Sequence, residues 1–276
     1  MEKINVMLNG LPGNVAGVIA RHIQADTRLQ LLPYALTGPQ IEADQCHIGD
    51  MAIALIRPDA RETRIETIKH EAGPFISVDY THPSAISDNA EFYGRHQLPF
   101  VMGTTGGDRD QLSRNVVAAN NTAIIAPNMA KQIVGFQAMM AYAAETFPNL
   151  FKGYHLTLRE SHQTGKADTS GTAKAMVTYF NQMGVDFTAE QIEKERDPER
   201  QANMWGIPAA HLDGHAWHTY SLVSPDETAR FQFTHNVNGR DIYGEGTADA
   251  VCFLSKQVAK GVTGKVYSMI DVLKSL

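Results

Sequence analysis

The stretch Ile4-Asn5-Val6-Met7-Leu8-Asn9-Gly10-Leu11-Pro12-Gly13-Asn14-Val15-Ala16 decides the fold of this 276-residue chain. A short apolar run leads into a glycine-rich turn, and a helical pattern then continues to Ile23. In dinucleotide-binding folds, the glycines of such a turn allow a tight bend and a close approach of the backbone to a pyrophosphate. Because the turn follows the first strand directly, we expect residues 10–15 to bind a dinucleotide.

Working outward from this unit, short apolar segments alternate with helical patterns through the first half of the chain. Strands are predicted over residues 4–8, 29–36, 51–56, 75–79, 99–102 and 123–126, with helices over 83–96 and 111–119 between the later ones. Short apolar strands that alternate with helices are typical of a parallel sheet with both faces covered. The sequence therefore predicts a Rossmann-type parallel-sheet domain.

After residue 128 the pattern changes. We predict a long helix over residues 129–147, a strand over 154–158, and an antiparallel hairpin with strands over 217–223 and 228–234. Helices over 247–259 and 266–273 close the chain. The fold class expected is α/β, with an α+β second domain that carries an antiparallel or mixed sheet.

The end of the second predicted strand bears on the choice of cofactor. Rossmann folds bind the adenosine ribose there, usually through an acidic residue. This chain reads Ala35-Leu36-Thr37-Gly38-Pro39, and Glu42 lies too far along to replace that carboxylate. Since no carboxylate would repel a 2′-phosphate, we expect Thr37 near the ribose and NADPH as the preferred cofactor, with NADH tolerated.

Two further segments follow predicted strands, at the carboxyl edge where open α/β sheets bind ligands. Gly103-Thr104-Thr105 comes after the fifth strand, and Ala126-Pro127-Asn128-Met129 comes after the sixth. Backbone and hydroxyl groups of the first segment are expected to hold the nicotinamide end of the cofactor and, through Thr105, a substrate carboxylate. A plain glycine turn is the alternative interpretation.

Residues 160–172, Glu-Ser-His-Gln-Thr-Gly-Lys-Ala-Asp-Thr-Ser-Gly-Thr, carry the catalytic chemistry that we predict. His162 and Lys166 are four residues apart, so one irregular turn could direct both side chains at one reacting group. Ser170-Gly171-Thr172 precedes an apolar helical pattern, and the free N–H groups of a helix start suit a carboxylate. A polar surface loop is the alternative.

This stretch resembles the catalytic signature of the dihydrodipicolinate (4-hydroxy-tetrahydrodipicolinate) reductase family. The common bacterial form has two adjacent histidines and a longer spacing, whereas His162-Gln163 is similar to the plant-type branch. The resemblance also covers residues 78–81, 103–107, 126–129, 214–221 and 235–240, in the same order along the chain.

The resemblance implies reduction of (2S,4S)-4-hydroxy-2,3,4,5-tetrahydrodipicolinate by NAD(P)H in the diaminopimelate route to lysine. It implies that His162 is the general acid, since its reference pKa is about 6.5, and that Lys166 stabilises negative charge or donates a proton. Residues 126–129 would contact the nicotinamide. The substrate would be bound by Thr105, Gln163, Lys166, Ser170, Gly171 and Thr172.

The resemblance also implies the domain organisation. Residues 1–128, completed by 242–276, would form the dinucleotide-binding domain, and residues 129–241 would bind substrate and mediate oligomerisation. The family is oligomeric, so we expect a homodimer or homotetramer.

Composition narrows the remaining classes. A net charge of −6 argues against a nucleic-acid partner, which would need a basic face. No apolar run reaches the ~20 residues of a membrane helix, and the first strand near Ile4 leaves no room for a signal peptide. We therefore expect a cytoplasmic protein without a membrane partner. His211, His215 and His218 invite a metal hypothesis, but Gly214 and strand alternation separate them, so no metal site is predicted.

Two alternatives belong to other classes. A semialdehyde dehydrogenase, or another nicotinamide-dependent reductase of a small dicarboxylate, would share the fold. The dehydrogenase would need a nucleophilic cysteine, and neither Cys46 nor Cys252 lies near a motif. A non-catalytic dinucleotide sensor could lose His162 and Lys166 without penalty, yet both are present.

Overall fold

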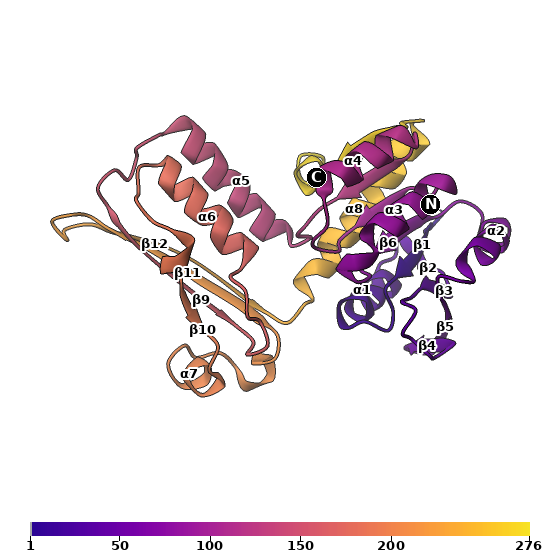
Figure 1. Cartoon of the computed structure of the whole chain (residues 1–276), viewed down its shortest axis with the longest axis horizontal. Coiled ribbons are helices and arrows are strands. Elements are labelled where there is room, and N and C mark those ends of the chain that lie inside the picture. Colours follow the sequence, from indigo (N-terminus) through magenta and orange to yellow (C-terminus); the bar gives the residue numbers. More distant parts are fainter. Residues whose placement is uncertain (1) are drawn as a thin grey trace. The chain divides into compact units, whose positions relative to one another are not determined.

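The computed structural model describes residues 2–276, and the chain forms two units (Figure 1). The first unit comprises the chain up to Lys131 together with Asp241–Leu276, and the second comprises Gln132–Arg240. Within residues 2–276, none of the helices combines the length and the apolar character that crossing a membrane requires.

A six-stranded sheet forms the centre of the first unit, and every neighbouring pair of its strands is parallel. In spatial order its strands are β13 (Lys265–Tyr267), β8 (Thr122–Ile125), β7 (Phe100–Met102), β6 (Ile76–Asp79), β1 (Ile4–Asn9) and β2 (Leu29–Leu31). The central strands consist almost entirely of buried residues, as the apolar runs predicted. The Rossmann-type parallel sheet is therefore confirmed.

Helices cover both faces of this sheet. One face packs against α2 (Arg61–Ala72), α3 (Ile86–Arg95) and α4 (Arg109–Ala118), whose apolar residues join Met7 and Phe100 in one core. The other face packs against α1 (Asn14–Ala25) and α8 (Ile242–Ala259). Full burial of each large apolar side chain here contributes about 1.5–3 kcal/mol.

Three strands outside the main sheet correct the sequence prediction. The single strand predicted over residues 29–36 is two strands, β2 and β3 (Tyr34–Leu36), because Pro33 has no N–H to donate to a ladder. The small sheet has the order β3-β5-β4, with β5 (Met51–Ile56) and β4 (Gln45–Ile48). The strand predicted at 51–56 thus exists, but it belongs to this small sheet and not to the main sheet. Similarly, the helix predicted from residue 266 begins only at α9 (Met269–Leu273), after β13.

The second unit has a mixed four-stranded sheet. Its strands are β10 (Glu193–Glu195), β9 (His155–His162), β11 (His215–Val223) and β12 (Arg230–Asn238), and only the β10–β9 pair is parallel. The helices α5 (Lys131–Thr146) and α6 (Gly171–Gln182) cover one face (Figure 1). Their apolar residues form a core with Leu158 and Tyr220 of the sheet. The remaining helical segments are α7 (Pro198–Asn203) and the 3₁₀ turns η1 (Pro83–Ala85), η2 (Ala189–Gln191) and η3 (Ala209–His211).

Candidate active site in two parts

The glycine-rich turn joins β1 to α1, as the sequence predicted. Gly10 has φ +104°, and a Cβ there would collide with the carbonyl oxygen of Tyr80. Gly13 is the N-cap of α1, and a Cβ on it would lie 2.7 Å from the carbonyl oxygen of Gly10. Only glycine therefore fits at both positions. The first N–H groups of α1 have no carbonyl partner within the helix, so they can bind a pyrophosphate.

A cavity of about 300 Å³ lies at the carboxyl edge of the main sheet. It brings together seven of the predicted cofactor residues: Val15, Gly103, Thr104, Thr105, Pro127, Asn128 and Met129. Tyr80, Thr81, Pro83 and Tyr243 also line it, and the sequence-based prediction missed them. A strand-end position was the signal for Tyr80 and Thr81, which directly follow β6.

The other predicted cofactor residues do not line this cavity. Thr37 is buried, and its hydroxyl donates to the carbonyl oxygen of Leu11 at 2.7 Å, inside the glycine-rich turn. Ala126 is also buried, and its N–H donates to the carbonyl oxygen of Met102. Gly10, Pro12, Gly13 and Asn14 form the turn itself and the start of α1.

A buried polar network fixes the loops around the cavity. The Asp79 carboxylate, at the end of β6, accepts hydrogen bonds from the Tyr93 hydroxyl at 2.7 Å and from the Thr104 hydroxyl at 2.9 Å. It also accepts from the backbone and side chain of Thr81 and from Asn89. Burial raises the pKa of Tyr93, so this phenol stays protonated and donates. The network ties Thr104 to the sheet.

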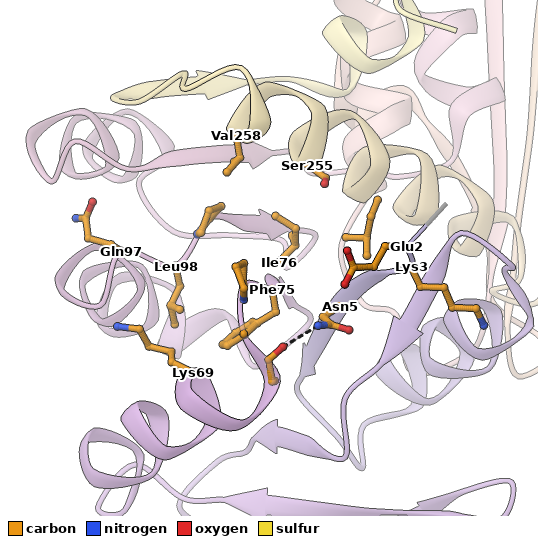
Figure 2. Close-up of a pocket in the computed structure, with 15 residues that line it drawn as sticks. Glu2, Lys3, Asn5, Lys69, Phe75, Ile76, Gln97, Leu98, Ser255 and Val258 are labelled. Carbon is orange, nitrogen blue, oxygen red and sulfur yellow. Dashed lines mark hydrogen bonds between the residues drawn. The ribbon is translucent and has the colours of Figure 1, made fainter.

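A larger cavity, of about 800 Å³, lies at the opposite edge of the same sheet (Figure 2). Phe75, Ile76 and Leu98 line it next to the starts of β6 and β7. Of its polar groups, the Asn5 amide is bonded to the carbonyl oxygen of Ala72, and Lys69 is paired with Glu66. Nucleotides bind at the carboxyl ends of parallel strands. The cavity of about 300 Å³ lies at that edge, so it is the better candidate for the cofactor site although it is the smaller of the two.

The predicted catalytic residues lie in the second unit. His162 is the last residue of β9, because that strand runs four residues beyond the predicted end at Leu158. Its ring is buried, and its Nδ1 lies 3.1 Å from the carbonyl oxygen of His215. Since a carbonyl only accepts, Nδ1 carries the proton of the neutral ring. Its Nε2 is buried and has no hydrogen-bond partner among residues 2–276.

The protonation state of His162 differs from the sequence-based expectation. Burial lowers the pKa of its imidazole well below the ordinary value, and the charges of His218, Arg196 and Lys166 lower it further. The neighbouring Glu160 opposes this effect without reversing it. In the protein without substrate, His162 is therefore neutral at pH 7. The reference pKa, which made it a suitable general acid, does not apply in this environment.

Lys166 lies in the loop between β9 and α6. Its ammonium is 2.7 Å from the carboxylate of Asp168, which is largely exposed. Gln163 begins the loop, and its carbonyl oxygen accepts the N–H of Lys166. Ser170 is the N-cap of α6, but its side chain makes no capping hydrogen bond within the part of the chain that the structure describes. The N-terminal groups of α6, including Gly171 and Thr172, are thus available for a carboxylate.

Two residues that the site prediction omitted hold this loop. Glu160 is fully buried, and Arg196 donates to its carboxylate at 2.5 Å. Although burial opposes the shift, hydrogen bonds lower the pKa of Glu160. We attribute the shift to Arg196, because His218 is 3.7 Å away, too far for a hydrogen bond. Glu160 stands two residues before His162 in the quoted motif, whereas no local signal marks Arg196.

Of the three histidines considered as metal ligands, His215 and His218 lie on opposite faces of β11. His215 bonds to the Ser161 hydroxyl on one face of β11, and His218 faces Glu160 and His162 on the other. Ligand atoms of Glu160, His162 and His218 lie within 4.8 Å of one another. Arg196 already neutralises the only carboxylate, which disfavours a divalent cation. The absence of a metal site stays a prediction.

Together these features define a class. A Rossmann-type sheet with a glycine-rich first turn and a cavity at its carboxyl edge is typical of dinucleotide-binding proteins. Residues 4–129 match the family model described as dihydrodipicolinate reductase, N-terminus, and residues 133–273 match the one described as dihydrodipicolinate reductase, C-terminus. The chain therefore belongs to the dihydrodipicolinate reductase family, and it is an NAD(P)H-dependent reductase of lysine biosynthesis.

Curated relatives support this family and the predicted branch. A probable 4-hydroxy-tetrahydrodipicolinate reductase 2 of Oryza sativa is 42% identical over 98% of this chain and 82% of its own length. A 4-hydroxy-tetrahydrodipicolinate reductase 1 of Arabidopsis thaliana is 43% identical over 98% of this chain and 78% of its own. A Janthinobacterium 4-hydroxy-tetrahydrodipicolinate reductase reaches only 28%, over 96% of this chain and 99% of its own. The plant-type resemblance is confirmed.

Among solved structures, a dipicolinate-bound dihydrodipicolinate reductase from Paenisporosarcina sp. TG-14 has the same fold, with a TM-score of 0.67. The two chains are 16% identical, and the match covers 97% of this chain and 98% of the other.

The cytoplasmic location predicted from the sequence is wrong. It conflicts with the rice and Arabidopsis relatives, which are named chloroplastic. The prediction had used the position of the first strand, and that feature carries no information about the compartment.

Proposed function

We propose that this chain reduces (2S,4S)-4-hydroxy-2,3,4,5-tetrahydrodipicolinate to tetrahydrodipicolinate and water, with NADPH preferred to NADH. The observation that carries the proposal is the loop between β9 and α6. His162, Lys166 and the N-terminus of α6 lie within one short segment, in a chain of the reductase family. NADPH, when bound, supplies the hydride.

We assign the proton transfer to Lys166. A neutral His162 cannot give up a proton from Nε2, because that nitrogen carries none, whereas the Nζ of Lys166 is a hydrogen-bond donor and donates to Asp168. The unpartnered Nε2 of His162 can accept a hydrogen bond and so orient a donor beside it. Both residues thus remain catalytic, with their roles divided.

The substrate is a dicarboxylate, and the start of α6 suits one of its carboxylates. The free N–H groups of Gly171 and Thr172 and the hydroxyls of Ser170 and Thr172 can donate to it. No acidic residue occupies the first turn of α6. Gln163 and Thr105 complete the proposed substrate-binding set.

The cofactor proposal rests on the residues around the glycine-rich turn. Thr37 is hydrogen-bonded to Leu11 within the turn, so it stands next to the segment that would bind the pyrophosphate. A hydroxyl at this place, in contrast to a carboxylate, does not repel a 2′-phosphate. This favours NADPH, which residues 10–15, 37, 103–105 and 126–129 would bind.

We assign nucleotide binding to the first unit, and substrate binding and oligomerisation to the second. The sheet face opposite α5 and α6 supports oligomerisation, because Arg159, Trp205 and Trp217 line a cavity there. Aromatic and arginine side chains are enriched in protein interfaces. A homodimer or homotetramer is expected.

The test is oxidation of NADPH coupled to the synthase that condenses pyruvate with aspartate semialdehyde. Lys166→Ala should lower kcat about 10²–10⁴-fold and leave the KM for NADPH unchanged. Lys152→Ala, at an exposed lysine of the same unit, is the matched control and should be neutral.

The pH profile separates the two possible proton donors. With Lys166 as donor, the pH dependence of kcat/KM between about pH 6 and 8 is the same in the wild type and in His162→Ala. A tenfold fall per pH unit over that range, abolished in His162→Ala, would return the role of general acid to His162. No NADPH oxidation by the wild type would refute the proposed function itself.

A further inference from the structure

Arg196 holds the catalytic loop almost alone. It directly follows β10, and its Nε donates to the carbonyl oxygen of Lys166 at 2.8 Å. Its Nη2 approaches the carbonyl oxygen of Asp168 at 3.4 Å, and its own carbonyl oxygen accepts the hydroxyl of Thr164. Within residues 2–276, every non-local hydrogen bond of residues 163–169 ends on Arg196.

The same guanidinium also reaches the other end of the loop through Glu160. Nη2 of Arg196 donates to Oε1 of Glu160, and Oε2 of Glu160 accepts the N–H of Ser170 at 3.1 Å. Glu160 is fully buried, so an unpaired carboxylate there would be costly. Arg196 therefore fixes Lys166 directly and the start of α6 through Glu160.

The planar guanidinium explains why this position needs arginine. Three of its nitrogens donate in different directions: Nε to the carbonyl oxygen of Lys166, Nη1 to the carbonyl oxygen of Glu195, and Nη2 to the carboxylate of Glu160. A lysine ammonium is a point charge on a flexible stem and cannot reproduce this fork. The contacts are charge-assisted on the Glu160 side, which makes them stronger than neutral hydrogen bonds.

We infer that Arg196 is a positioning residue of the reductase, which through Glu160 and the Lys166 carbonyl sets the proton donor and the carboxylate-binding start of α6. This inference rests on the proposed function for the role of Lys166. It assigns no contact between Arg196 and the substrate.

The decisive variant is Arg196→Ala, with Arg200→Ala as the matched control. Arg200 lies nearby on α7, is more than half exposed, and bonds Glu195 at 2.8 Å without touching the loop. Binding of dipicolinate, a stable dicarboxylate, is measured by calorimetry, and loop order by hydrogen exchange of residues 163–172. In Arg196→Ala, dipicolinate should bind at least about tenfold more weakly, and the loop amides should exchange faster. The dissociation constant for NADPH should stay within about twofold, because the nucleotide residues lie in the other unit.

Rescue distinguishes positioning from a general loss of structure. Guanidinium chloride at low concentration should partly restore both dipicolinate affinity and kcat in Arg196→Ala, whereas Arg196→Lys should recover only part of either. Unchanged dipicolinate affinity and loop exchange in Arg196→Ala, or equal losses in Arg200→Ala, would overturn the inference. These binding readouts need no turnover, so an inactive wild type would count against the proposed function and not against the role of Arg196.

Discussion

Removing the hydroxyl of Tyr93 tests the network that holds the cofactor cavity. In Tyr93→Phe the ring stays packed against Phe100, and one oxygen is lost. That oxygen donates to Asp79 at 2.7 Å, a charge-assisted bond of about 1.5–3 kcal/mol. It also accepts the amide of Asn9, which is buried and would be left without this acceptor, at a cost of about 1–3 kcal/mol. Because the two effects share one atom and need not add fully, we expect a total of about 3 kcal/mol.

Hydrogen exchange is a suitable assay, because it reports each unit separately. A loss of about 3 kcal/mol corresponds to roughly 100-fold lower protection for the amides of β1 and β6, while the core of the second unit serves as internal reference. Tyr34→Phe is the control, since its hydroxyl bonds an exposed Glu71 and should be worth less than about 0.5 kcal/mol. Less than a fivefold change in Tyr93→Phe, or an equal change in Tyr34→Phe, would refute this reasoning.

Two further predictions concern acid stability and cofactor choice. Burial lowers the pKa of His235 to about 4 and that of His215 below its usual value. Between about pH 6.5 and 4 the unfolded chain therefore takes up protons that the native unit does not. As the pH falls through this range, the free energy of unfolding decreases by up to about 1.4 kcal/mol per pH unit for each histidine. Melting followed by the fluorescence of Trp205 and Trp217, both in the second unit, should show this fall, and His235→Gln should make it shallower; a pH-independent melt would contradict it. Thr37→Asp should raise the KM for NADPH at least about tenfold, which needs only about 1.4 kcal/mol, and leave that for NADH level or lower. Thr37→Val, which loses only the bond to Leu11, should affect both cofactors alike, and an equal response to the aspartate would show that Thr37 does not contact the ribose.

Local patterns predicted what depends on local chemistry. The glycine-rich turn could be predicted because a glycine directly after a strand indicates a tight turn. In the structure Gly10 has a positive φ and approaches Tyr80 closely, and both features require glycine. The residues at the carboxyl edge could be predicted because the carboxyl ends of parallel strands lie at the same edge of a sheet. Thr105 and Asn128 both line the cavity there.

The rest depends on contacts far apart in the chain. Nothing near Met51 reveals that β5 pairs with β3 and β4 and not with the main sheet. The neutral state of His162 follows from burial and from charges that the fold assembles around it. Arg196 is 36 residues from Glu160, and only the pairing of β10 with β9 brings the two together.

The discontinuity of the first unit affects how the chain is made. Strand β13 and helix α8 complete the nucleotide-binding sheet, and both come from the segment after Arg240. All residues of the second unit, in contrast, have been synthesised once the ribosome has passed Arg240. At about 5–20 residues per second, synthesis of Asp241–Leu276 takes roughly 2–7 seconds. During that interval the unit translated first still lacks a sheet edge and a covering helix, whereas the inserted unit already has every residue it needs to fold. Synthesis therefore reverses the usual order, in which the amino-terminal domain is completed first.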